Sequence, residues 1–237
     1  MLIDKSNQRV RQMFGEIAAK YDRMNHLLSM NVDRLWRRKT VRMVRPLTNA
    51  PILDVCTGTG DLAIALYKEK KGKATVVGAD FCREMLKIGE RKRIRRGFLD
   101  NFKFVEADAQ ALPFESGSFQ LVTVAFGLRN VADTDLGLRE MTRVCAPDGK
   151  VAVLEFSMPT RQPFRGFYRW YFKNILPRIG QLFARNASDA YAYLPDTVED
   201  FPCGQALVSR MEAAGLTSVE FHPLTMGIAT LYIGRKI

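Results

Sequence analysis

A glycine-containing turn joins a short apolar segment to a helical pattern early in the chain. The segment ILDVC (52–56) runs into TGTG (57–60). Small residues in a strand-to-helix turn let a ligand approach the backbone, and glycine tolerates the dihedral angles that such a turn requires. Gly58, Gly60 and Ala63 also satisfy the GxGxxA dinucleotide fingerprint. The turn therefore predicts a site for a nucleotide-containing cofactor, and NAD is one candidate.

Two acidic positions further along the chain narrow this choice. Asp80 follows a second apolar segment, twenty positions after Gly60, where a carboxylate can accept hydrogen bonds from ribose hydroxyls. Asp108 and Ala109 follow a third segment, where a carboxylate and a backbone amide could address an adenine edge. NAD proteins share the ribose contact. However, two helices are predicted before the first strand, which favours a methyltransferase, because dinucleotide domains often start at that strand.

Alternating strand and helix patterns must position these residues. Apolar periodicity predicts helices at 9–21 and 33–45, ahead of the sheet. We then expect strands at 52–56, 75–79, 102–106, 119–126 and 150–156, separated by helices at 60–70, 83–96 and 133–145. Such alternation predicts a parallel sheet in a doubly wound, Rossmann-like α/β fold. After a helix at 204–214, two final strands lack room for a crossover helix and should pair as antiparallel neighbours.

We expect one domain with four parts. These are N-terminal helices (1–48), a cofactor-binding core (50–156), an inserted helical cap (157–203), and a C-terminal helix with a strand pair (204–237). Within the cap, residues 163–186 interleave aromatic residues with arginines. Segments of this kind rest in the lipid interface of a membrane. The alternatives are an ordinary cap whose aromatics pack on the core, or an apolar cap that pairs two subunits in a homodimer.

The composition of the chain indicates which binding partners and which cellular compartment are expected. The four cysteines form no CxxC or Cys/His cluster, so we expect neither a metal site nor a disulfide framework, and a reducing cytosol fits best. The N-terminus lacks the apolar core of a signal peptide, and no apolar run approaches the roughly 18 residues of a membrane span. A net charge of +11 favours a polyanion, either nucleic acid or an anionic lipid surface.

Five stretches of the sequence are similar to the UbiE/MenG family of quinone C-methyltransferases. They are YDRMNHLLSMNVDRLW (21–36), DVCTGTGDLA (54–63), FGLRNV (126–131), RVCAPDGKVAVLEFS (143–157) and LFARNASDAYAYLPDTVEDFP (182–202). The resemblance implies the class I S-adenosylmethionine fold, a seven-stranded sheet whose last strand pair is antiparallel. It also implies methyl transfer to a ring carbon of a prenylated quinol in menaquinone biosynthesis, ubiquinone biosynthesis or both. Members of the family act on demethylmenaquinol, the acceptor we expect, on a methoxy polyprenyl benzoquinol, or on both. The protein would then be cytoplasmic and peripheral to the inner face of the membrane.

The resemblance also carries over site residues. The family's S-adenosylmethionine contacts fall on Thr59, Asp80, Asp108 and Ala109. With the residues of the glycine turn and its neighbours, the predicted cofactor set is Asp54, Gly58, Thr59, Gly60, Asp80, Phe81, Asp108 and Ala109. The chain departs from the family pattern in three places. Asp33 replaces a common histidine, Ala146-Pro147-Asp148 replaces lysine-proline-glycine, and Ala125 stands where a serine sometimes occurs.

Carbon methylation of a quinol requires a group that stabilises the phenolate as it forms. Arg129 is the leading candidate, because it follows the fourth strand, where ligands of open α/β sheets collect. Asn130 is a weaker candidate, and Tyr21 and Asp33 could face the site from the N-terminal helices. A structural ion pair is the alternative role for Arg129.

Two other functions stay open. The basic runs keep an RNA methyltransferase in view, although no RNA-binding module and no base-flipping motif follow the fourth strand. A non-catalytic cofactor-binding scaffold in a quinone-synthesis complex is the other alternative.

Overall fold

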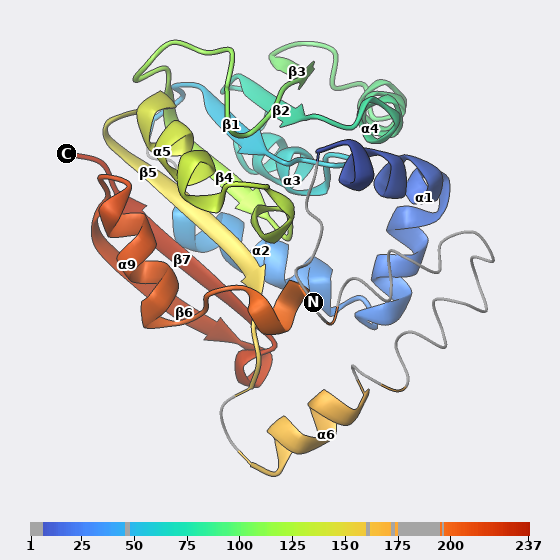
Figure 1. Cartoon of the computed structure of the whole chain (residues 1–237). Helices are drawn as coiled ribbons and strands as arrows, with labels where there is room; N and C mark the ends of the chain where they lie inside the picture. The colour runs from blue at the N-terminus through green and yellow to red at the C-terminus, as the bar shows by residue number, and fades with distance from the viewer. Residues whose placement is uncertain (1–6, 46–47, 160–161, 172–173, 175–194, 196) are drawn as a thin grey trace.

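A mixed seven-stranded sheet in the order β3-β2-β1-β4-β5-β7-β6 organises the chain (Figure 1). The computed structural model describes residues 7–45, 48–159, 162–171, 174, 195 and 197–237. The strands are β1 (Ile52–Val55), β2 (Val76–Asp80), β3 (Phe102–Glu106), β4 (Phe119–Ala125), β5 (Cys145–Phe156), β6 (Thr217–Leu224) and β7 (Ala229–Arg235). Strands β1 to β5 pair in parallel, whereas β7 pairs antiparallel with both β5 and β6. The predicted fold class and the antiparallel final strands are confirmed.

Helices cover both faces of this sheet. They are α1 (Asn7–Leu28), α2 (Val32–Val44), α3 (Asp61–Glu69), α4 (Arg83–Arg95), α5 (Thr134–Val144), α6 (Phe164–Trp170) and α9 (Gln205–Ala213), with short 3-10 segments η1 (Leu128–Asn130) and η3 (Thr225–Gly227). α2 and α3 pack on one face, and α5 and α9 pack on the other. Since both faces are covered, β1 and β2 are buried along their whole length, as their mainly apolar composition predicts.

The strand order places a crevice beside β1. Neighbouring strands continue from β1 to β2 on one side and to β4 on the other, so the connections leave in opposite directions at this point. In open α/β sheets, ligands bind at such a switch point, outside the carboxyl ends of the strands. The glycine turn after β1, Asp80 at the end of β2 and η1 after β4 all lie at this edge.

Helix α1 is longer than the predicted helix at 9–21, and the predicted end was wrong. Its apolar stripe continues through Met24 and Leu28. The helix ends just before Met30 and Asn31, whose φ angles of 50° and 62° cannot continue a right-handed helix. Rather than covering the sheet, α1 lies beside α4 (Figure 1). Ala18 packs there against Cys82 and Met85.

Strand β5 also differs from its prediction. It begins at Cys145, directly after α5, instead of at residue 150. The pairing with β4 shifts its register between Phe119 and Leu121, and Asp148 has a positive φ of 59° within the extra segment. The turn-like composition of that segment concealed the early pairing.

The predicted cap is only partly within the described residues. Helix α6 lies there, set apart from the sheet in Figure 1, but residues 175–194 lie outside the described part, so the division at 157–203 stays a prediction. Among the described residues, no helix is both long and apolar enough to cross a membrane. In the same residues no group of three or more histidine, cysteine or acidic side chains could hold a metal ion.

Candidate active site

The glycine turn forms the floor of a groove of about 940 Å³ at the carboxyl ends of β1, β2 and β4, here named the donor groove. Gly58 has a φ of +57°, and a Cβ placed on it would point into open space. A Cβ on Gly60, in contrast, would lie 2.5 Å from the ring of Phe104. Gly58 thus leaves room for a ligand, whereas Gly60 lets the turn pack against the protein. Of the predicted cofactor residues, Gly60 is the one that does not line the groove.

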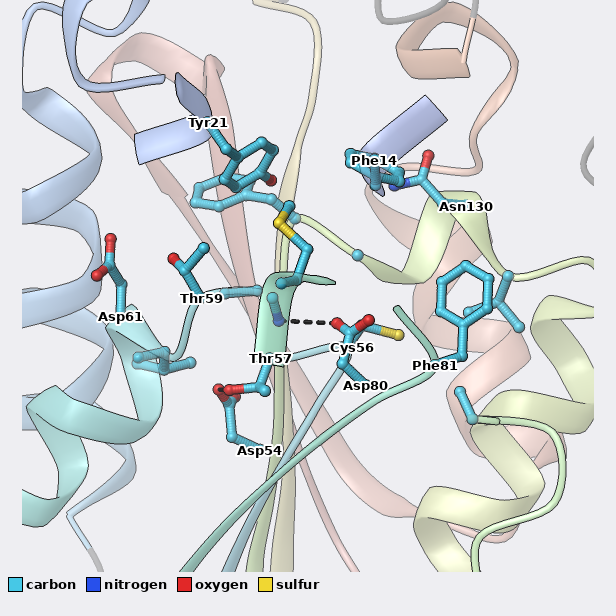
Figure 2. Close-up of a pocket in the computed structure, with 18 of the residues that line it drawn as sticks. Phe14, Tyr21, Asp54, Cys56, Thr57, Thr59, Asp61, Asp80, Phe81 and Asn130 are labelled. Carbon is cyan, nitrogen blue, oxygen red and sulfur yellow. Dashed lines mark hydrogen bonds between the residues drawn. The ribbon is translucent and has the colours of Figure 1, made fainter. Parts of the chain in front are cut away.

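Asp80 is fixed at the centre of the donor groove by backbone amides. Its Oδ2 accepts a hydrogen bond from the amide of Gly58 at 2.7 Å, drawn as the dashed line in Figure 2, and its Oδ1 accepts one from the amide of Cys82 at 2.9 Å. Burial raises the pKa of Asp80 to about 6, although these amides oppose the shift. The carboxylate therefore stands where ribose hydroxyls could donate to it.

Asp54 supports the turn from below. It accepts hydrogen bonds from the hydroxyls of Thr57 at 2.6 Å and Thr123 at 2.7 Å. Burial raises its pKa to about 6, while both hydroxyls and the charge of Arg37 oppose that shift. Next to it, burial and then the charges of Asp80 and Asp54 raise the pKa of the Cys56 thiol well above its usual range. Cys56 lines the groove as a protonated thiol.

One end of the donor groove suits an adenine. Phe81, Asp108 and Ala109 line it, and the amide and side chain of Gln110 donate to Asp108. Arg11 of α1 lies next to this end, because its guanidinium donates to the carbonyl of Phe81 at 2.6 Å and to Glu106 at 2.8 Å. The sequence analysis missed Arg11, whose contacts lie 70 and 95 positions along the chain.

The opposite end holds a charged cluster, with Thr59 and Asp61 on the far side from Phe81 in Figure 2. The Thr59 hydroxyl donates to Asp22 of α1 at 2.6 Å. The Lys92 ammonium of α4 lies 2.5 Å from Asp22 and 2.8 Å from Asp61. Together these contacts tie α1 to the glycine turn and to α4. Asp22 lies within a segment that marks the family resemblance, but no sequence signal pointed to Lys92.

A second, larger pocket of about 1500 Å³ opens next to the donor groove and is here named the apolar pocket. Aromatic and aliphatic side chains from α1, α2, the ends of β4 and β5, and α6 dominate its lining. The two pockets share one wall, formed by Phe14, Tyr21, Asn25, Arg37, Phe126 and Asn130. A polar groove and an apolar pocket thus meet at a boundary only one side chain thick.

Two predicted catalytic residues, Tyr21 and Asn130, belong to this shared wall. Burial raises the pKa of Tyr21, while the charges of Arg129 and Arg37 and a hydrogen bond with Asn25 oppose the rise. Tyr21 is therefore a neutral hydroxyl. The Oδ1 atom of Asn130 is buried and has no hydrogen-bond partner among the described residues. Buried polar atoms are normally paired, so this oxygen is suited to a ligand.

Arg129 lines the apolar pocket but not the donor groove. Its Nη1 lies 2.6 Å from Glu155 Oε1, and its guanidinium carbon lies 5.2 Å from the centre of the Phe156 ring. Both charged side chains are buried, with 7% and 1% of their surfaces exposed. The structural ion pair considered as the alternative for Arg129 is present. Its Nε is also buried and without a hydrogen-bond partner in the described part of the chain.

Asp33 is the buried centre of a polar chain between α1 and α2. It accepts from the Ser29 hydroxyl at 2.6 Å and pairs with Nδ1 of His26 at 2.9 Å and with the guanidinium of Arg37. Burial would raise the pKa of Asp33, but the Ser29 hydrogen bond and the Arg37 charge hold it below its usual value. Asp33 is therefore ionised. It lines the apolar pocket itself and contacts Arg37 and His26, which line the donor groove.

The donor groove fits S-adenosylmethionine. It offers an open cradle at Gly58, a fixed carboxylate for a ribose and an adenine end at Asp108, in one line. A family model described as the ubiE/COQ5 methyltransferase family matches residues 2–236. The "Demethylmenaquinone methyltransferase" of Thermus thermophilus is 48% identical over 224 residues, which cover 94% of this chain and 100% of that protein. The "Ubiquinone/menaquinone biosynthesis C-methyltransferase UbiE" of Geotalea uraniireducens is 40% identical over 234 residues, 99% of each chain.

Solved structures agree on the fold. A SAM-dependent methyltransferase from Aquifex aeolicus has a TM-score of 0.62 at 17% identity and covers 85% of this chain and 89% of its own. The [4+2]-cyclase SpnF has a TM-score of 0.73 at 14% identity and covers 100% of this chain and 98% of its own. At such identities the likeness shows the fold alone.

Proposed function

The chain belongs to the ubiE/COQ5 methyltransferase family, and on that premise we propose that it transfers a methyl group from S-adenosylmethionine to a ring carbon of a prenylated quinol. Demethylmenaquinol is the proposed acceptor, because the relative with 48% identity is named for demethylmenaquinone. A methoxy polyprenyl benzoquinol is the second candidate, since other relatives carry the joint ubiquinone/menaquinone name.

The meeting of the two pockets carries this proposal. A quinol has a polar ring and a long apolar tail, and the apolar pocket offers room for the tail directly behind the shared wall. The ring would then lie at that wall, within reach of the donor groove. Holding two reactants in this geometry can supply roughly 7–11 kcal/mol of the barrier reduction.

When bound, S-adenosylmethionine supplies an electrophilic methyl group. The protein must make the quinol ring more nucleophilic, and a phenolic hydroxyl has an unperturbed pKa of about 10. In this proposal the unpartnered Oδ1 of Asn130 accepts a hydrogen bond from such a hydroxyl, and Tyr21 donates one; both residues line the donor groove. Because the Cys56 thiol stays protonated, it does not compete as a nucleophile.

We assign Arg129 the stabilisation of the developing phenolate through its charge and its free Nε–H. Removing one such preorganised donor typically slows a reaction by about 10²–10³-fold. Glu155 offsets part of the charge of Arg129, but it also fixes the guanidinium beside the apolar pocket. Asp33, in contrast, is proposed to act as a positioning residue, because it contacts Arg37 and His26.

We also propose that the protein works at an anionic membrane surface as a peripheral protein on the cytoplasmic side. Phe167 and Trp170 of α6 are exposed, and Arg165 and Arg169 of the same helix are exposed too. Apolar side chains beside cations favour the interface of an anionic bilayer. The net charge of +11 supports the same surface. If the acceptor is a quinol, nucleic acid is not a substrate of the reaction. Homodimer formation is a separate question, which analytical ultracentrifugation can answer.

The decisive experiment supplies labelled S-adenosylmethionine with three acceptors in detergent: reduced demethylmenaquinone, the methoxy polyprenyl benzoquinol, and total RNA. Label in a quinol is expected and identifies the acceptor. Label in RNA alone would overturn the proposal in favour of an RNA methyltransferase. Cofactor binding with no label in any acceptor would favour a non-catalytic scaffold.

A further inference from the structure

The donor groove has an uneven distribution of charge. Its lining contains five aspartates, Asp22, Asp54, Asp61, Asp80 and Asp108. Among the described residues that line it, Arg37 is the one arginine or lysine side chain. S-adenosylmethionine carries a sulfonium and an ammonium that suit an acidic groove, but it also carries one α-carboxylate. A groove lined with aspartates would repel that carboxylate unless a cation meets it.

Arg37 lies at the end of the groove where the amino-acid part of the cofactor belongs. Adenine, ribose and methionine follow one another along the cofactor, and the adenine end is marked by Asp108 and the ribose by Asp80. The third segment therefore reaches toward Thr59 and Asp61, on the far side from Phe81 (Figure 2). Although burial would raise the pKa of Asp61, the charges of Lys92 and Arg37 lower it below its usual value, which places Arg37 near this end.

The guanidinium of Arg37 is fixed in position but keeps N–H donors available for a ligand. Its Nη1 donates to Asp33, and its central carbon lies 5.4 Å from the centre of the Phe126 ring. Asp33 in turn is fixed by Ser29 and His26. A guanidinium has five N–H donors, and in the described part of the chain the contact with Asp33 is the hydrogen bond that Arg37 makes. Further donors are left for a two-pronged contact with a carboxylate.

The other nearby cationic side chains, Lys92 and Arg129, are paired with acidic residues and do not line the donor groove. Lys92 contacts Asp22, Asp61 and Thr59 and does not line the donor groove. Arg129 is paired with Glu155 and lines only the apolar pocket.

We propose that Arg37 binds the α-carboxylate of S-adenosylmethionine and that Asp33 positions its guanidinium. This assignment concerns the methyl donor and does not depend on which acceptor is methylated. It also gives a role to Asp33, at the position where the family commonly has histidine. The Asp33 carboxylate orients the Arg37 guanidinium, which binds the cofactor.

The test compares two ligands by calorimetry, S-adenosylhomocysteine and 5′-methylthioadenosine, which lacks the amino-acid part. Arg37→Gln should weaken S-adenosylhomocysteine binding by about 10- to 100-fold, as expected for a lost charge-assisted contact, and should leave 5′-methylthioadenosine within about twofold. Asp33→Asn should shift the same ratio in the same direction by a smaller factor. Arg38→Gln, an exposed neighbour on α2, is the matched control and should change neither ligand.

Two outcomes would overturn the assignment. Equal loss of affinity for both ligands in Arg37→Gln would mean that the residue supports the fold of the groove. Arg37→Lys is the control for misfolding, because it keeps the charge and should recover part of the preference for S-adenosylhomocysteine over 5′-methylthioadenosine. Unchanged S-adenosylhomocysteine binding together with slower methyl transfer would mean that the guanidinium acts on the acceptor instead.

Discussion

Charges around the shared wall are held as pairs. Arg129 is bound to Glu155, and Arg37 is bound to Asp33. A buried pair adds little net stability, but removing one partner leaves an uncompensated charge that costs about 3–5 kcal/mol. A single substitution at Arg129 therefore mixes a catalytic effect with a stability effect, and the two must be separated by design.

The variant Arg129→Gln should lose methyl transfer by about 10²–10³-fold and should also unfold at a lower temperature, because Glu155 stays buried without its partner. The double variant Arg129→Gln/Glu155→Gln removes both charges, so thermal stability should largely return while activity stays low. Cofactor affinity should change little in either protein, since Arg129 does not line the donor groove. A double variant with full activity would show that Arg129 serves only the fold.

The raised pKa of Asp80 predicts a pH dependence of cofactor binding. Ribose hydroxyls need the carboxylate as an acceptor, so a proton on Asp80 competes with the cofactor below its pKa of about 6. Affinity for S-adenosylhomocysteine should fall about tenfold between about pH 7 and pH 5. Asp80→Asn should bind weakly with no such slope. If that variant keeps the slope, Asp54, which has the same pKa of about 6, is the titrating group instead.

The stability of the folded protein should depend on pH in the opposite direction to cofactor binding. Because the folded protein holds this proton more tightly than the unfolded chain, whose aspartate pKa is 3.8, the stability contribution of Asp80 is greatest below about pH 4. It is lost as the pH rises through about 6. As the pH rises from about 4 to about 6, the affinity for the cofactor should therefore increase while the stability contribution of Asp80 decreases. Thermal melts with and without ligand can measure both changes.

Helix α1 forms one side of the donor groove and is attached at two points along its length. Arg11 holds it over the adenine end through Phe81 and Glu106. Asp22 holds it at the other end through Thr59 and Lys92. A bound cofactor would lie beside these two contacts, so we expect α1 to move when the cofactor enters or leaves.

Asp22→Asn should speed the release of S-adenosylhomocysteine by about tenfold, because it replaces a charge-assisted contact with a neutral one. Stopped-flow fluorescence measures that rate, and hydrogen exchange should show weaker protection in α1. The control is Asp135→Asn, which removes an exposed pair with Arg210 far from α1. An unchanged release rate would show that α1 is held by packing against α4 alone.

The sequence predicts the sheet well because the local patterns are strong. Segments such as 52–56 and 119–126 are mainly apolar and largely buried, and glycine is required where the turn packs against Phe104. The contacts of Arg11 and Lys92 could not be predicted in this way, because they depend on how α1 packs against α4. Sequence alone could not pair Arg129 with Glu155 either, because that contact depends on η1, which follows β4, lying beside the end of β5.

At the scale of the whole molecule, a net charge of +11 acts together with the exposed surface of α6. The side chains of Phe167 and Trp170 are 63% and 54% exposed. The same helix contributes Phe164, Phe167 and Tyr168 to the apolar pocket, so Phe167 belongs to both surfaces. One helix thus joins the proposed membrane-facing surface to the place proposed for the quinol tail.

The double variant Phe167→Ser/Trp170→Ser should lose most flotation with anionic vesicles at low salt, where the wild type should float. Leu99→Ser is the matched control, because Leu99 is 62% exposed but lies between α4 and β3. It should float like the wild type, and vesicles of neutral lipid should bind poorly. Equal flotation of the double variant would assign the surface to some other part of the chain.

One side of both pockets is the same helix: α1 supplies Phe14, Tyr21 and Asn25 to the donor groove and to the apolar pocket alike. Occupancy of the two sites is therefore thermodynamically linked. By reciprocity, whatever factor the methyl donor adds to the affinity for the acceptor, the acceptor adds to the affinity for the donor. Where that factor exceeds one, the ternary complex is favoured over either binary complex, and departure of the spent donor lowers the affinity for the methylated product.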